Sequence, residues 1–344
     1  APALIFTAIN HGSAAASGWG IPTATDIAFA VGILSILGDR VPVSLKVFLT
    51  ALAIADDLIA ILVVALFYGG TINFGLLSIA FVLIALVLLM NKLGEKRGWF
   101  YLVPAIAIWS LFYYAGIHST MSGVVMAFLV PMTPRFNEAY FHRKRLQYIR
   151  RLNEYNGIAS TSSEFPNGPQ RHCLRRLSAI SRDSIGMSYR LEHALGPWVN
   201  FLIMPIFALA NAGVEIPDVS YFNVFQFDQV LGSVSMGIFL GLVLGKPLGI
   251  SLASFIAVKL HVGEMPAKST WPMLIAVACL GGIGFTMSIF VDTLSFGDQT
   301  PEVMARLRDM GKVAVLMGSL CAGILGSVLI NIIHGIESRK AVKA

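Results

Sequence analysis

Charged residues are scarce in this sequence. Only 13% of the 344 residues are Asp, Glu, Lys or Arg, while 56% are apolar; ordinary soluble domains are about 25% charged. A soluble fold of this length cannot bury so much apolar surface, so the composition excludes that class and indicates an integral membrane protein. Cysteine is equally rare. The three cysteines, Cys173, Cys279 and Cys321, lie far apart, and their spacing indicates neither a disulfide framework nor a metal site.

The start of the chain lacks an initiator methionine and a basic signal-peptide segment before Ala1. The first apolar run, residues 2–9, is too short to cross a bilayer. We therefore expect the chain to begin inside a helix whose preceding part is missing.

Positive charge is concentrated in one loop. The net charge is +6, but residues 135–190 contain 11 Lys and Arg against 4 Asp and Glu, and the rest of the chain sums to −1. This distribution indicates membrane topology rather than nucleic-acid binding. Within the loop, residues 143–151 favour a basic helix, and the Ser-, Gly- and Pro-rich residues 156–170 favour a flexible segment. We interpret the loop as a cytoplasmic surface that contacts anionic lipid, or alternatively as a regulatory docking element.

Long apolar runs are abundant and show no strand-like alternation, which predicts a helical bundle. With the incomplete helix at the start, about nine and a half spans are expected, namely 14–36, 43–68, 74–91, 99–116, 119–131, 197–213, 231–258, 271–291 and 312–333. Alternate linkers carry most of the loop cations. The positive-inside rule then places the 135–190 loop and the C-terminus in the cytoplasm.

Four charged residues, Asp26, Asp56, Asp57 and Lys246, lie inside apolar runs. An ionised group at the bilayer centre costs from about 3 to more than 10 kcal/mol, so such residues persist only when they are paired, hydrated or functional. The competing interpretation is a purely structural ion pair. Such a pair requires one acid and one base, whereas three acids and one lysine lie inside the apolar runs of this chain. We expect Lys246 to pair with an aspartate of another span.

Asp56 and Asp57 give the sharpest functional signal. Neighbouring residues on a helix point about 100° apart, so one carboxylate can face a cavity while the other contacts a helix partner. Two adjacent carboxyl groups should titrate as a coupled unit. Sodium requires oxygen ligands, which Asp supplies. The pair therefore indicates exchange of protons for a hard cation.

Two predicted spans contain helix breakers. Pro22 and Thr25 precede Asp26 in the first, and Gly281, Gly282 and Gly284 interrupt the second. Unwound backbone at bilayer depth is tolerated only beside a cavity. Each broken span precedes one long apolar span, which indicates an inverted repeat with a site near the midplane. Glycines at 237, 241, 245 and 249 form a ridge suited to close helix packing.

Histidines provide a weaker signal. His118 and His193, the latter beside Glu192, lie at predicted span boundaries. Capping or interfacial solvation explains them, and a pH switch is the functional alternative because histidine titrates near neutrality.

Four ordered motifs resemble those of the NhaA-type sodium/proton antiporters: ATDIAFA at 24–30, AIADDL at 53–58, GKPLGI at 245–250 and GIGFTMSI at 282–289. The inverted-repeat rule is itself known from transporters that include this family. The resemblance covers nearly all of the chain except 135–185. It implies twelve helices in the bacterial inner membrane with both ends cytoplasmic. By motif order this chain begins within the third helix, without the dimerisation hairpin.

The resemblance also implies roles for individual residues. Asp57 corresponds to a principal sodium ligand, and Asp56 shares ion and proton duties and pairs with Lys246. Asp26 and Thr25 correspond to residues where two broken helices cross. Glu192, His193 and His118 correspond to pH-sensing residues. The sequence departs from the family at Gly196, where a second histidine is common, in the long 135–190 insertion, and at Asp292, which has no clear counterpart.

We therefore predict an all-α membrane protein of inverted-repeat architecture, with transmembrane helices at 1–134, a basic cytoplasmic insertion at 135–190 and transmembrane helices at 191–344. The predicted activity is electrogenic, pH-regulated Na⁺(Li⁺)/H⁺ antiport in sodium and pH homeostasis. We expect no cofactor and no nucleic-acid partner, contact with membrane lipid, and a possible homodimer.

Other classes fit less well. An intramembrane aspartyl protease needs a Gly-x-Gly-Asp motif, which no aspartate here has. A prenyltransferase needs Asp-Asp-x-x-Asp, and its fifth position is Ala60. A sodium symporter of related architecture would not need two adjacent acids and a lysine.

Overall fold

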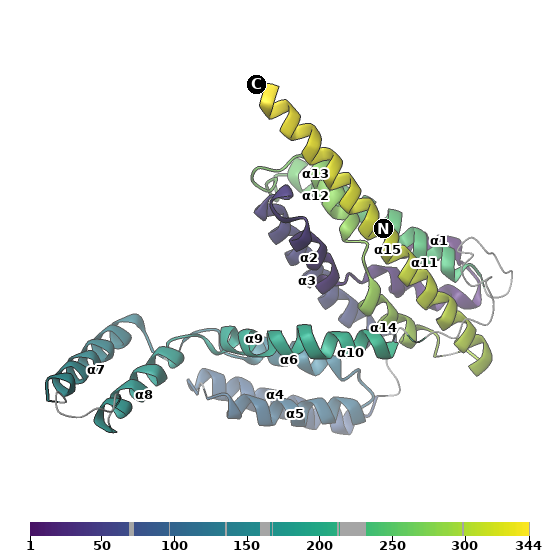
Figure 1. Ribbon diagram of the computed structural model, residues 1–344. Helices are drawn as coiled ribbons and strands as arrows, with labels where there is room; N and C mark the ends of the chain where they lie inside the picture. Colours follow the sequence, from purple (N-terminus) through teal and green to yellow (C-terminus); the bar gives the residue numbers. More distant parts are fainter. Residues whose placement is uncertain are drawn as a thin grey trace. The chain divides into compact units, whose positions relative to one another are not determined.

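The chain folds into helices (Figure 1). The computed structural model describes residues 1–68, 72–95, 97–134, 136–158, 166, 168–211, 213, 232–297 and 299–343. The chain divides into two compact units, the first made of Ala1–Gly69 with Ile203–Ala344 and the second of Gly70–Leu202. The all-helical prediction is confirmed for the described part of the chain.

The first unit contains three continuous helical segments long and apolar enough to span a membrane: α3, α15, and the run from α11 through η5 to α12. Its helices are α1 (Pro2–Ile9), η1 (Ala14–Thr23), α2 (Ile27–Ile36), η2 (Gly38–Arg40), α3 (Val43–Phe67), α10 (Met204–Asn211), α11 (Val234–Leu240), η5 (Gly241–Gly245), α12 (Lys246–Lys259), α13 (Trp271–Leu280), α14 (Phe285–Ser295) and α15 (Pro301–Lys343). The long α15 packs along α11 and α13 (Figure 1).

Two apolar spans are broken, as predicted. The helical axis bends by 42° between η1 and α2, and by 52° between α13 and α14. Pro22 lies near the end of η1, which is a 3₁₀ helix. The second break occupies residues 281–284, where a methyl group added at Gly282 would collide with the Leu242 carbonyl oxygen and one added at Gly284 with the Ser288 hydroxyl. At Gly282 glycine is required because another backbone approaches so closely.

The predicted glycine ridge is a packing surface. Gly237 faces Phe6 of α1, and Gly241 faces Pro22 of η1. The ridge residues lie along α11, η5 and α12, so this span can approach both partners at backbone distance, and the prediction of close packing is confirmed. A single π-helical turn, η5, ends where Lys246 donates its backbone N–H to the Gly241 carbonyl. Pro247 has no N–H to continue the regular ladder, which favours this shift in hydrogen-bond register.

The second unit has its own apolar core, which includes Ala80, Ile108, Phe112 and Met126. Its helices are α4 (Phe74–Lys92), α5 (Trp99–Tyr114), α6 (Thr120–Leu129), α7 (Glu138–Ile158), α8 (Gly168–Asp183) and α9 (Met187–Trp198). The π-helical η3 (Val199–Ile203) then continues from α9 towards α10. The basic helix predicted at 143–151 lies within α7. The predicted flexible segment at 156–170 falls partly outside the described residues.

Among the described residues, seven spans qualify by length and composition when each broken pair counts as one. The sequence predicted about nine and a half, and the difference falls on α5, α6 and α1. These are 16, 10 and 8 residues long. At 1.5 Å per residue a 16-residue helix is about 24 Å long, which is shorter than a hydrocarbon core of about 30 Å.

Candidate ion-binding site

The two broken spans meet at their breaks. The Asp26 backbone N–H donates to the Ile283 carbonyl at 2.6 Å. The Thr25 hydroxyl lies 3.1 Å from the Gly281 carbonyl oxygen. These contacts join two points of the chain that are more than 250 residues apart. At both points the helix is broken, so backbone groups that lack a partner within their own helix bond to the other span.

Asp26 caps two helices. One carboxylate oxygen accepts from the Phe29 N–H of α2 at 3.2 Å, and the other accepts from the Thr286 N–H of α14 at 3.0 Å. The second oxygen also accepts from the Thr286 hydroxyl at 2.5 Å. The side chain is 1% exposed. Its negative charge therefore compensates two positive helix N-termini in a site that water does not reach.

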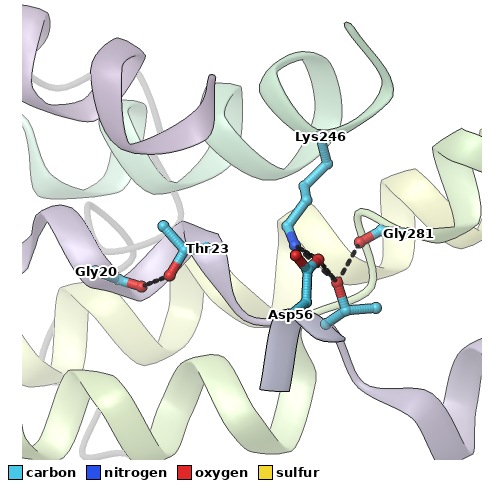
Figure 2. A network of polar contacts seen from close by, with 6 residues as sticks. Gly20, Thr23, Asp56, Lys246 and Gly281 are labelled. Atoms are coloured by element: carbon cyan, nitrogen blue, oxygen red, sulfur yellow. Dashed lines mark hydrogen bonds and ion pairs between the residues drawn. The ribbon is translucent and has the colours of Figure 1, made fainter. Parts of the chain in front are cut away.

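Lys246 forms the predicted ion pair. Its Nζ lies 2.5 Å from Asp56 Oδ2 and 2.7 Å from the Thr25 hydroxyl oxygen. Figure 2 shows the lysine extending from α12 to Asp56, with the Gly281 carbonyl of the second break beside them. Lys246 is 4% exposed and the Asp56 side chain 26% exposed. The pair thus joins α12 to α3 at the crossing.

The Thr25 hydroxyl has two acceptors for one proton. It lies 3.0 Å from Asp56 Oδ2 and 3.1 Å from the Gly281 carbonyl oxygen. Because it also accepts from Lys246, the hydroxyl is held by three groups, and its proton can serve Asp56 or Gly281 but not both.

Asp57, the next residue of α3, has no such partner. Its Oδ1 is buried and has no hydrogen-bond partner within the described ranges. Asp26, Lys246 and Asp56 are the charged groups that act on it. A buried carboxylate oxygen without a donor is costly, and a bound cation or proton would remove that cost.

The donor set suits a hard cation. Among the residues that the structure describes, no three His, Cys, Asp or Glu side chains converge as they would around a transition metal. The oxygen atoms available near the crossing belong to Asp56, Asp57, Thr25 and the Gly281 carbonyl. Oxygen-only sites favour small hard cations over soft ones.

Sequence reasoning missed two residues of the crossing. Thr286 lies in a quoted motif but was given no role, and Ser319 was not considered. The Ser319 hydroxyl, from α15, accepts from the backbone N–H groups of Gly284 and Phe285, both at 3.1 Å. It thereby caps α14 from another helix. A lone serine inside an apolar run was the only available signal.

Replacing Ser319 with Ala should lower the free energy of unfolding by about 1 kcal/mol, the usual value of a helix cap. Thermal unfolding in detergent would measure this. The matched control is Ser35→Ala, because Ser35 is exposed and bonds only to the Val31 carbonyl of its own helix. Equal effects of the two substitutions would contradict the capping role of Ser319.

The predicted pH-sensing residues lie in the second unit. His118 is in the turn between α5 and α6, and its Nδ1 lies 2.9 Å from the Thr120 hydroxyl; burial lowers the pKa of this imidazole. His193 is exposed on α9, next to Glu192, and its ring centroid lies 3.9 Å from that of Tyr189. Their pH-sensing roles stay predictions.

Two broken apolar spans that cross at buried acids and a lysine define a secondary ion transporter. The chain belongs to the Na⁺/H⁺ antiporter 1 family, whose model matches residues 1–330. It is a multi-pass membrane protein and a transporter.

Curated relatives agree with this assignment. The chain is 40% identical to the Na(+)/H(+) antiporter NhaA of Syntrophobacter fumaroxidans over 326 residues, covering 94% of this chain and 67% of the relative. It is 40% identical to the NhaA of Oleidesulfovibrio alaskensis over 341 residues, covering 99% and 73%. It is 41% identical to the NhaA of Acidithiobacillus ferrooxidans over 326 residues, covering 95% and 72%.

Proposed function

We propose that this chain exchanges Na⁺ for H⁺ across the membrane, the activity for which its relatives are named, and that Asp57 and Asp56 bind the transported ion. The observation that carries the site assignment is the buried Asp57 oxygen without a donor, beside the Lys246–Asp56 pair at the crossing. The activity explains why acids are retained at this depth. A structural ion pair alone would need Asp56 and Lys246 but not Asp57.

The two ions compete for the same oxygens. Sodium binds Asp57 and Asp56 when both are deprotonated, and Thr25 adds a neutral oxygen. A sodium ion at Asp56 displaces the lysine ammonium, because the two positive charges cannot share one carboxylate oxygen 2.5 Å from Nζ. Proton uptake by Asp57, together with return of the Lys246 ammonium to the Asp56 carboxylate, expels sodium. Competition of this kind couples the two fluxes without a separate gate for each ion.

Exposure of the site changes sides by movement of the half-helices at the crossing. In this proposal Asp26 keeps the N-termini of α2 and α14 compensated during the movement, and Lys246 offsets the carbonyl at the end of α13. The 135–190 loop and the C-terminus face the cytoplasm of a bacterial inner membrane, as the loop charges favour.

Four finer features belong to the same proposal: Li⁺ as a second substrate, contact of the basic loop with anionic lipid, assembly as a homodimer, and control by pH through Glu192, His193 and His118. The family resemblance supports the substrate, the dimer and the pH control, and loop charge supports the lipid contact.

Reconstitution in proteoliposomes tests the activity. With a pH gradient imposed, added Na⁺ should collapse the gradient, while the larger, more weakly held K⁺ should have little effect. The measurement is the fluorescence of a ΔpH-sensitive dye, with protein-free liposomes as the control. Equal responses to Na⁺ and K⁺ would contradict a selective oxygen site. A collapse that requires no added cation would contradict coupled exchange.

A further inference from the structure

A polar stripe runs along α14 inside an otherwise apolar region. Ser288, Asp292 and Ser295 are 0%, 0% and 3% exposed. Spacings of four and three residues place them on one face of the helix. The stripe begins one turn beyond Gly284, at the crossing, and ends at the last residue of α14. It therefore connects the crossing with the far end of this half-helix.

Asp292 is the titratable member of the stripe, and no role assigned above uses it. Neither of its carboxylate oxygens has a hydrogen-bond partner within the described ranges, and the same holds for the Ser288 hydroxyl. The carboxyl group lies directly against Gly311 of α15, where an added methyl group would collide with it. Asp292 is thus a fully enclosed acid for which Gly311 leaves space, but its carboxylate oxygens have no hydrogen-bond partner among the described residues.

The charged groups that act on Asp292 all come from the first turns of α15: Lys312, Arg308 and Asp309. Lys312 donates instead to the Gly213 carbonyl at 2.8 Å and lies 4.0 Å from Asp309. The Nε of Arg308 is buried without a hydrogen-bond partner in the described ranges. Cations are therefore nearby, but none of these contacts is an ion pair with Asp292.

An ionised carboxylate in an apolar interior costs far more free energy without a contacting cation or hydrogen-bond donors than a neutral carboxyl group does without hydrogen bonds. Two cations lie close to Asp292, and within the described part of the chain neither forms an ion pair with it, so no contact fixes its charge state. Its neighbours on this face of α14 are the Ser288 hydroxyl and Ser295, whose hydroxyl donates to the Val291 carbonyl at 2.7 Å.

We propose that Asp292 is a second proton-exchanging carboxyl group, separate from the Asp56–Asp57 pair, on a polar stripe that leads from the crossing to the end of α14. Proton exchange at Asp292 stands on its own surroundings. Only its participation in transport rests on the proposed function.

The test compares the wild-type chain with Asp292→Asn, which keeps the shape of the side chain but cannot exchange a proton. The melting temperature of both proteins is measured in detergent from about pH 5 to about pH 9. We expect the difference between them to change by about 2 °C or more over the lower part of that range and to level off over the upper part, because folded Asp292 loses its proton within the range while the unfolded carboxyl group is ionised throughout. Asp39→Asn, at an exposed aspartate of η2, is the matched control and should show a constant difference over the neutral and alkaline part of the range.

A constant difference between Asp292→Asn and wild type across the whole range would overturn the proposal, since Asp292 would then be ionised in the folded and unfolded states alike. A difference that changes uniformly over the whole range would also overturn it, since folded Asp292 would then stay protonated. Should the Asn variant not fold, Asp292→Glu in protein with ¹³C-labelled aspartate replaces it. Infrared difference spectra between the two pH limits should then lack one aspartate carboxyl band present in wild type, and identical spectra would also overturn the proposal.

Transport separates this proposal from the assignment of the ion site. In proteoliposomes Asp292→Asn should still show Na⁺-induced collapse of the pH gradient, with a pH profile displaced from that of wild type. An undisplaced profile would remove Asp292 from the transport cycle. Loss of the ion site itself is a different outcome, because it would appear in variants of Asp57 and leave the Asp292 titration unchanged.

Discussion

Asn in place of Asp57 should reduce Na⁺-dependent exchange by about 10- to 100-fold. A contact to a charged group contributes about 1.5–3 kcal/mol, and each 1.4 kcal/mol changes an equilibrium tenfold. The amide keeps the shape of the side chain but loses the charge, and it cannot be exchanged between a proton and a cation. The measurement is the initial rate of ΔpH collapse in proteoliposomes over a range of Na⁺ concentrations.

The fold should survive this substitution. Among the residues that the structure describes, the buried Oδ1 of Asp57 makes no hydrogen bond, so the amide removes no contact from that atom. Na⁺ should raise the melting temperature of the wild-type chain, because a ligand that binds only the folded state stabilises it, and this shift should disappear in Asp57→Asn. Asp39→Asn should behave as wild type in both measurements. Full exchange activity in Asp57→Asn would mean that the transported ion binds elsewhere.

Met in place of Lys246 should lower the free energy of unfolding by about 3 kcal/mol. Removing one partner of a buried ion pair leaves the other charge uncompensated and typically costs 3–5 kcal/mol. The lower end applies here because the Asp56 side chain is 26% exposed and keeps some contact with water. The variant also loses the lysine's contact with the Thr25 hydroxyl.

The pair can be separated from general damage to the core by a double-mutant cycle. Asp56→Asn combined with Lys246→Met should recover most of the loss, because no unpaired charge is then left in the site. Lys259→Met, at the exposed end of α12, is the control and should change stability by less than about 0.5 kcal/mol. Additive effects of Asp56→Asn and Lys246→Met would show that the two side chains do not interact.

The positions of the intramembrane charges made much of the site predictable. The sequence predicted an acidic partner for Lys246 because an unpaired ammonium group at bilayer depth costs too much free energy. That partner is Asp56. The breaks at Pro22 and at Gly281–Gly284 were predictable because proline and glycine weaken helices locally. The ridge of glycines at four-residue spacing similarly indicated a packing face before any partner was known.

Contacts between distant residues were not predictable in this way. The hydrogen bond from Thr286 to Asp26 crosses 260 positions, and no local pattern reports which serine of α15 will reach the start of α14. Asp292 was visible as an acid near a span, but its enclosure depends on Gly311 of another helix. The sequence predicted the positions of the spans better than their number, because α5 and α6 are apolar but too short to count as spans.

The double cap at Asp26 restricts how the crossing can move. The same carboxylate holds the first turns of α2 and α14, which belong to different spans. Pulling the two turns apart would leave the buried Asp26 carboxylate without either its one donor from α2 or its two donors from α14. We therefore expect the first turns of α2 and α14 to move together as one rigid unit. Any rocking motion must then take place in the outer ends of these two helices and in the opposite halves of the two spans, η1 and α13.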